Sequence, residues 1–258
     1  MKHETVFGVH ALQAVLSQRP ESVLELQVQQ GCDNQRVNQL LELAQQSGLK
    51  PQWVKKAVLD KVSEGGVHQG IAAKVKPRPM LDESALINLL KEQDPQSAHH
   101  HLFLVLDTLD DPHNLGACLR SAECAGVTGV ILTKDKMPKV SSIVRKVASG
   151  AADLLPIYQV TNLANTLKRM KEQGVWIVGT ACDEEAKSIY ETSFTGSIGI
   201  VLGAEGRGMR RLTRELCDFV AYIPLAGAID SLNVSVAAGV VLFEARRQRL
   251  LAEAAQPA

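Results

Sequence analysis

The second part of the chain alternates short apolar runs with helical segments, and this alternation constrains the fold more than any other feature. Apolar runs predict strands at 102–106, 129–132, 175–179, 198–202 and 219–223. Helical spacing predicts helices at 115–125, 141–148, 163–172, 209–215 and 234–249. Apolar strands that alternate with helices indicate an α/β fold, with a mostly parallel sheet covered on both faces. Ligands of such sheets bind beyond the carboxyl ends of the strands.

The first 77 residues predict a separate, smaller α/β domain with its own helices and strands. Lys76-Pro77-Arg78-Pro79 breaks that pattern and begins a linker. We therefore expect domains at 1–77 and 101–258 with a linker at 78–100. The linker carries a short helix at 84–90 and ends near His99, His100 and His101. These histidines could bind a metal adventitiously, but a solvated linker is the interpretation we favour.

Charge and composition narrow the function classes. The 258 residues carry 28 Lys and Arg against 28 Asp and Glu, so no global basic field indicates a nucleic-acid partner. Residues 1–80 carry 10 basic and 7 acidic side chains, a net +3, which weakly favours this part as the nucleic-acid-facing module. No apolar run approaches the roughly 20 residues of a membrane span. Five scattered cysteines without a Cys-x-x-Cys pair favour a cytoplasmic protein with no structural zinc site.

Polar loops follow three of the predicted strands. In the first loop, Asn114 lies at an expected helix N-cap, and Arg120 follows one to two turns later. The alternative is purely structural, with Asn114 as a cap and Arg120 paired with Glu123. The second loop, Gly203-Ala204-Glu205-Gly206-Arg207-Gly208, is neither a dinucleotide fingerprint nor a phosphate loop. Its glycines favour a tight turn that presents Glu205.

The third loop joins the last strand, which ends near Ile223-Pro224, to the C-terminal helix. It carries Asp230, Ser231 and Asn233 among apolar residues. One helix cap needs only one such residue, so three indicate a binding or catalytic site. Capping alone remains the structural alternative.

Other chemistries lack their motifs. The chain has no G-x-S-x-G elbow and no H-E-x-x-H pair. Cys118 could be a nucleophile, but its apolar neighbours favour a packing role. His68 and Gln69 lie between glycines, where they could either contact RNA or bond to their own loop.

The three loops resemble the motifs of the SpoU (TrmH) family of RNA ribose 2'-O-methyltransferases. The matching patterns are Asn114-x-Gly116-x-x-x-Arg120, Gly203-x-Glu205-Gly206-x-Gly208 and Ile223-Pro224 followed by Gly227 and Ser231-Leu232-Asn233-Val234-Ser235. The segment around His68-Gln69-Gly70-Ile71 is similar to the small RNA-binding domain of that family, which is related to ribosomal protein L30e. Within the family, the chain most resembles the bacterial 23S rRNA guanosine 2'-O-methyltransferases.

The resemblance implies a trefoil-knotted methyltransferase domain that works as a homodimer. It also implies S-adenosylmethionine as the cofactor, held by loops that contain Thr180, Gly203, Ile223 and Leu232. The implied catalytic set is Asn114, Arg120, Glu205, Ser231 and Asn233. The arginine of this set would reach across the dimer interface.

The expected reaction moves a methyl group from a sulfonium to a ribose 2'-hydroxyl. Arginine is effectively never deprotonated in proteins, so Arg120 is expected to anchor a phosphate and stabilise the developing alkoxide. His113 is a conceivable proton acceptor. The resemblance implies 23S rRNA as the partner, with the guanosine of the peptidyl-transferase P-loop as the target. The alternatives are a tRNA ribose 2'-O-methyltransferase and a non-catalytic rRNA-binding assembly factor.

Overall fold

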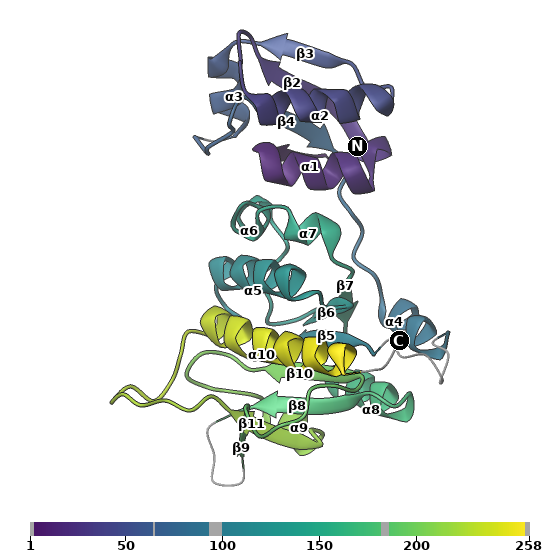
Figure 1. Ribbon diagram of the computed structural model, residues 1–258, viewed down its shortest axis with the longest axis vertical. Coiled ribbons are helices and arrows are strands. Elements are labelled where there is room, and N and C mark those ends of the chain that lie inside the picture. Colours follow the sequence, from purple (N-terminus) through teal and green to yellow (C-terminus); the bar gives the residue numbers. More distant parts are fainter. Residues whose placement is uncertain (1–2, 64, 93–99, 182–185, 256–258) are drawn as a thin grey trace. The chain divides into compact units, whose positions relative to one another are not determined.

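The computed structural model describes residues 3–63, 65–92, 100–181 and 186–255, which form two compact units (Figure 1). The first unit comprises Met1–Pro79 together with Val140–Leu154, and the second comprises Met80–Lys139 and Leu155–Ala258. The boundaries 1–77, 78–100 and 101–258 remain sequence-based predictions. The units differ from them in one main respect, since 140–154 group with the N-terminal residues.

The first unit contains a four-stranded mixed sheet. Its strands, in spatial order, are β1 (Glu4–Phe7), β4 (Ile71–Val75), β2 (Val23–Gln29) and β3 (Pro51–Val54). The β2–β3 pair is parallel, and β4 is antiparallel to both β1 and β2. The sheet carries α1 (Val9–Gln18), the short η1 (Pro20–Ser22), α2 (Gln35–Gln46) and α3 (Lys56–Val62). Apolar residues of α1, α2 and the strands share one buried core, which includes Leu12, Val15, Leu26 and Leu40.

Two short helices complete the first unit. They are α6 (Ser142–Ala148) and α7 (Ala151–Leu154). Both follow β6 of the second unit in sequence, yet α7 packs on α1 and α6 packs on β1. This segment of the chain is therefore built into the N-terminal unit.

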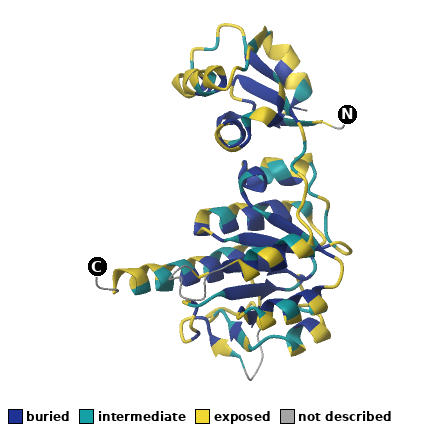
Figure 2. Cartoon of the chain, turned by 90° about the vertical axis from the view of Figure 1, so that its right-hand side faces the viewer, coloured by how far each residue is buried: buried dark blue, intermediate teal, exposed yellow. Residues whose placement is uncertain are grey.

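The second unit is a seven-stranded, fully parallel sheet, which confirms the predicted α/β fold class. Its strands, in spatial order, are β7 (Ile157–Val160), β6 (Gly129–Thr133), β5 (Leu102–Leu106), β10 (Ile198–Leu202), β8 (Trp176–Thr180), β11 (Phe219–Tyr222) and β9 (Lys187–Ser188). Every strand pair is parallel. All residues of β5, β6 and β10 are buried, because helices cover both faces (Figure 2).

Five helices belong to the second unit. They are α4 (Glu83–Lys91), α5 (Pro112–Ala125), α8 (Leu163–Glu172), α9 (Arg211–Glu215) and α10 (Val234–Ala254). One face of the sheet shares a core with α4 and α8, whereas α5 and α10 pack closely against each other. The helix predicted at 84–90 is thus present, but it packs in the second unit, and Leu81 forms a bridge to Tyr158. Residues 93–99 of the predicted linker, His99 included, lie outside the described residues.

The strands and helices predicted for residues 101–258 are all found, with ends shifted by a few residues, and the helix predicted at 141–148 is α6 of the first unit. Two short strands were not predicted: β7, which has only four residues after Pro156, and the two-residue β9. The trefoil knot implied by the resemblance remains a prediction. Among the described residues, no helix is both long and apolar enough to cross a membrane.

Candidate active site

The loop between β10 and α9 presents Glu205 at the carboxyl edge of the parallel sheet. Ala204 and Gly208 pair across this loop, and Gly206 and Gly208 have positive φ angles of 72° and 65°. These angles lie in the left-handed region that glycine adopts without a steric cost. The tight turn predicted from the three glycines is therefore present.

Glu205 is the centre of a hydrogen-bond cluster that joins all three polar loops. Its Oε1 accepts from Asn233 Nδ2 at 2.6 Å, from Asn114 Nδ2 at 3.2 Å and from the Val234 backbone N–H at 3.1 Å. Asn233 Nδ2 also donates to Asn114 Oδ1 at 3.0 Å. The structure thus brings together three of the five predicted catalytic residues.

Asn233 is both a helix cap and a member of this cluster. Its Oδ1 accepts from the Ser235 backbone N–H at 2.9 Å at the start of α10, which is a standard N-cap bond. Its amide nitrogen faces the other way, toward Glu205 and Asn114. Capping and clustering are therefore compatible, since they use different atoms of one side chain.

The prediction that Asn114 caps α5 is wrong. Asp111 is the N-cap, because its Oδ1 accepts from the His113 N–H at 2.8 Å, and Pro112 occupies the first helical turn. Asn114 lies inside the helix, so its side chain is available to Glu205 and Asn233.

A cavity of about 420 Å³ opens beside the cluster. It is lined by Thr180, Leu202, Gly203, Ala204, Glu205, Gly206, Gly208, Ser231, Leu232, Asn233, Val234 and Ala237. Of the four predicted cofactor contacts, Thr180, Gly203 and Leu232 line it, but Ile223 does not. Gly203 is required for packing, because a Cβ there would lie 2.1 Å from the Gly208 carbonyl carbon.

An ion pair between the buried Asp107 and the half-exposed Arg210, which was not predicted from the sequence, anchors the Glu205 loop. Asp107 is fully buried at the end of β5. Its carboxylate accepts from the Arg210 backbone N–H at 2.8 Å and from Arg210 Nε at 2.7 Å. A carboxylate directly after an apolar strand was the available signal, but its partner lies 103 residues away.

Arg120 and Ser231 lie outside the hydrogen-bonded cluster. Arg120 is exposed on α5, and its side chain has no hydrogen bond or ion pair with another described residue, so the alternative pair with Glu123 is not observed. Ser231 lines the cavity and donates only a long 3.4 Å bond to Asp230.

Structural contacts account for Cys118 and His68, whereas the role suggested for His113 remains a prediction. Burial raises the pKa of the fully buried Cys118 thiol to about 12, which supports the packing interpretation. His68 Nδ1 accepts from the Gly70 N–H at 3.0 Å, and Gln69 Oε1 accepts from the Val9 N–H at 2.9 Å. His113 is exposed and contacts the carboxylate of Asp111. The described part of the chain contains no group of three or more potential metal ligands.

Two family models match the chain and together span most of its length. The SpoU rRNA methylase family matches residues 101–243, which include every residue of the Glu205 cluster. A model described as RNA 2'-O ribose methyltransferase substrate binding matches residues 5–81.

Curated relatives are similar along almost the whole chain. The 23S rRNA (guanosine-2'-O-)-methyltransferase RlmB of Vibrio vulnificus is 49% identical over 254 residues, which cover 98% of this chain and 100% of that protein. RlmB of Escherichia coli K12 is 46% identical over 246 residues, which cover 95% and 99%.

Solved structures share the fold. A structure titled RNA 2'-O ribose methyltransferase superposes with a TM-score of 0.76 at 27% identity, covering 96% of this chain and 89% of that chain. The SpoU methyltransferase AviRb from Streptomyces viridochromogenes, in complex with AdoMet, gives 0.74 at 22% identity, covering 96% and 91%. The matched family models and the extent of these identities lead to one conclusion: the chain belongs to the SpoU rRNA methylase family.

Proposed function

We propose that this chain transfers a methyl group from S-adenosylmethionine to the ribose 2'-oxygen of a guanosine in 23S rRNA. The observation that carries the proposal is the Glu205–Asn233–Asn114 cluster, which lies at the mouth of a glycine-walled cavity at the carboxyl ends of parallel strands. Relatives with this activity match 95% or more of the chain.

The cavity suits an adenosine-containing ligand. Its volume of about 420 Å³ lies within the range of roughly 300–1,000 Å³ that small-molecule sites have. Its walls are largely loop backbone at Gly203 and Gly206, with Leu202 and Leu232 as apolar contacts. When bound, the cofactor supplies a methyl group on a positively charged sulfur, which is an already activated electrophile.

The protein's own residues then have to align the ribose and stabilise the negative charge that develops on its 2'-oxygen as the hydroxyl proton leaves. Glu205 holds the amides of Asn114 and Asn233 in fixed positions through its single Oε1 atom. Alignment of this kind accounts for much of the barrier reduction in a displacement between two bound reactants. Arg120 would bind an RNA phosphate and stabilise negative charge on the 2'-oxygen, since a guanidinium forms paired bonds to such groups.

The chain is proposed to act as a homodimer in which Arg120 completes the partner's site. Arg120 is exposed and makes no described contact with the Glu205 cluster of its own chain. In addition, α10 exposes Val236, Phe243 and Leu250 at seven-residue intervals, an apolar stripe that a second copy would cover.

The finer target that we propose is the guanosine of the peptidyl-transferase P-loop, with the reaction taking place in the cytoplasm. A tRNA ribose is the second candidate. Both readings use the same cavity and cluster, because these residues handle the cofactor and a ribose rather than an RNA sequence.

The test is transfer of labelled methyl from S-adenosylmethionine to unmodified 23S rRNA, with tRNA in parallel. Label on a 23S guanosine 2'-oxygen supports the proposal, whereas label on tRNA alone replaces the substrate. RNA binding without any transfer would instead support a non-catalytic assembly factor. Failure to bind the cofactor would reject the methyltransferase mechanism.

A further inference from the structure

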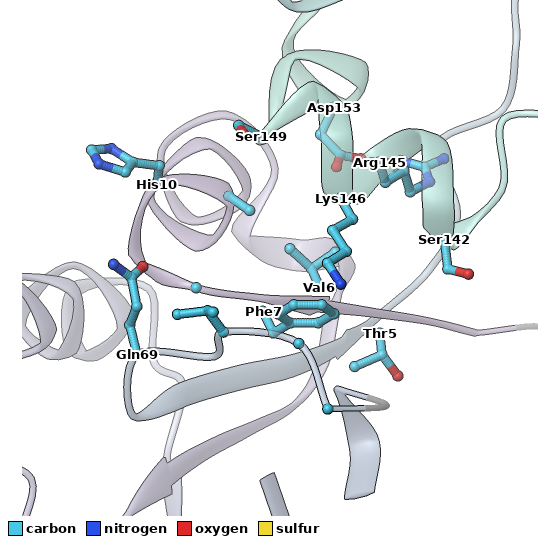
Figure 3. A pocket seen from close by; sticks show the side chains of 15 residues that line it. Thr5, Val6, Phe7, His10, Gln69, Ser142, Arg145, Lys146, Ser149 and Asp153 are labelled. Atoms are coloured by element: carbon cyan, nitrogen blue, oxygen red, sulfur yellow. Dashed lines mark hydrogen bonds and ion pairs between the residues drawn. The ribbon is translucent and has the colours of Figure 1, made fainter. Parts of the chain in front are cut away.

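A second cavity, of about 310 Å³, lies in the first unit (Figure 3). One wall is formed by β1 and the start of α1, a second by the loop at 65–69, and a third by α6 and the residues that follow it. Its lining includes Phe7, His10, Val67, Gln69 and Lys146. The proposed methyl-transfer site uses none of these residues.

Buried ion pairs hold the α6 wall in place. Arg145, on α6, pairs with Glu4 of β1 at 2.8 Å and with Asp153 of α7 at 2.5 Å. Asp153 also pairs with Arg19, which follows α1. Both arginine side chains are about nine-tenths buried, at 10% and 11% exposure. The cavity therefore has a preformed shape.

Unfavourable backbone conformations concentrate around this cavity. Three described residues other than glycine have positive φ angles, and two of them, Gln69 at 52° and Ser149 at 51°, line it. Such conformations are unfavourable for residues with a side chain and often occur at ligand sites. The bond from the Val9 N–H to Gln69 Oε1 fixes the first of these residues at the rim.

The lining favours an anion. Lys146 is exposed and forms no ion pair with another described residue, whereas Asp153, the one carboxylate among the described lining residues, is paired with two arginines. The net charge of the first unit also favours an anionic ligand. Residues 1–79 and 140–154 carry 12 Lys and Arg against 8 Asp and Glu, a net +4, so the rest of the neutral chain is −4. The difference in net charge between the two structural units, +4 against −4, is larger than that between residues 1–80 and 81–258, which is +3 against −3.

The cavity also offers an aromatic and apolar surface. The ring of Phe7 packs on Gly66, where a Cβ would lie 2.6 Å from Phe7 Cε2, so one side of the ring is closely covered by backbone. Val67 is 81% exposed beside it. Figure 3 shows Lys146 pointing from α6 toward Phe7, which places a cation and an aromatic ring in one cavity.

We propose that this cavity binds one unstacked nucleotide of the RNA substrate, with the base against Phe7 and Val67 and a phosphate at Lys146. Aromatic stacking combined with a nearby cation is how proteins commonly bind single-stranded RNA. The proposal rests on the proposed function and extends it. The cavity residues between 142 and 153 lie outside the family match for substrate binding (5–81) and inside the match for the methylase family (101–243). The proposal therefore gives a segment of the methylase match a role in RNA binding.

The test measures the affinity of the full-length protein for unmodified 23S rRNA, without methyl transfer, at several salt concentrations. The variants are Lys146→Ala, Phe7→Leu and Ser142→Trp, which fills the cavity from an exposed position. Lys50→Ala is the matched control, because Lys50 is an exposed lysine of the same unit that does not line the cavity.

Phe7→Leu should weaken RNA binding by roughly 5- to 150-fold, which corresponds to the loss of one base–aromatic stack. Lys146→Ala should lower the slope of log affinity against log salt by about 0.7 to 0.9, while Lys50→Ala leaves it unchanged. Ser142→Trp, which keeps the charge, should also weaken binding. Binding of all three variants at the wild-type level would overturn the proposal.

Affinity for S-adenosylmethionine, measured on the same samples, separates this proposal from the proposed function. Unchanged cofactor affinity with weakened RNA binding supports the second cavity. Wild-type RNA binding by the variants rejects the cavity as an RNA site, even if methyl transfer is confirmed.

Discussion

Replacing Asp153 with asparagine should destabilise the first unit strongly and leave the second unit intact. The Asp153 side chain is 2% exposed and lies between Arg19 and Arg145. Asparagine keeps its size but removes its charge, and it places an NH₂ donor among guanidinium donors. Arg145 would then keep Glu4 as a carboxylate partner, whereas the buried Arg19 would lose Asp153 and keep its hydrogen bond to the Lys76 carbonyl oxygen.

The size of the effect follows from this burial. Removing one partner of a buried ion pair costs about 3–5 kcal/mol, because the other charge stays buried without compensation. With a urea slope of about 2 kcal/mol/M, the unfolding midpoint of the first unit should fall by about 1.5–2.5 M. Replacing an exposed carboxylate such as Asp33 should change the free energy of unfolding by less than about 0.5 kcal/mol.

The chain provides a separate fluorescent probe for each unit. Trp53 lies on β3 of the first unit and Trp176 lies on β8 of the second, and the chain has no other tryptophan. Two variants, each with one of the two tryptophans replaced by phenylalanine, therefore report on one unit each during urea unfolding. Asp33→Asn in the same two backgrounds is the control. A Trp53 transition at the control value in Asp153→Asn, or an equal shift of the Trp176 transition, would contradict a stabilising role of these ion pairs in the first unit.

Three further predictions concern the site. Gly203→Ala should weaken S-adenosylmethionine binding, because the new Cβ would force the Glu205 loop outward. Gly196→Ala is the control, because Gly196 has open space around it and its replacement should leave binding unchanged. Titration calorimetry measures both affinities. Arg120→Ala should retain cofactor affinity and lose most turnover, so unchanged turnover would remove it from catalysis. Burial raises the pKa of Cys118 to about 12, so Cys118 should resist alkylation at pH 8 while the exposed Cys124 reacts. Mass spectrometry of the labelled peptides measures both reactions, and rapid labelling of Cys118 would contradict its burial.

The pattern of apolar strands was sufficient to predict the parallel sheet and the edge on which the site lies. Glu205, Asn233 and Asn114 follow three different strands, and parallel strands bring their carboxyl ends to one edge. The cap of α5 could not be assigned with confidence from sequence, because Asp111 and Asn114 are both good capping residues three positions apart.

The partners of buried charges were beyond sequence reasoning. Helical spacing predicts that α6 is a helix but not which unit it packs against. Asp153 and Arg19 are 134 residues apart, and nothing local to either residue indicates the pair. The Asp107–Arg210 pair, which anchors the catalytic loop, was missed for the same reason.

The position of the modified nucleotide distinguishes ribose methylation of 23S rRNA from the alternatives. 23S rRNA from cells that lack this gene would be incubated with the protein and S-adenosylmethionine, and 2'-O-methyl groups would be located by resistance of the backbone to alkaline hydrolysis. We expect one new resistant linkage, at a guanosine, with wild-type protein and none with Arg120→Ala. A methyl group on a base, or no modified 23S ribose alongside a modified tRNA, would contradict it.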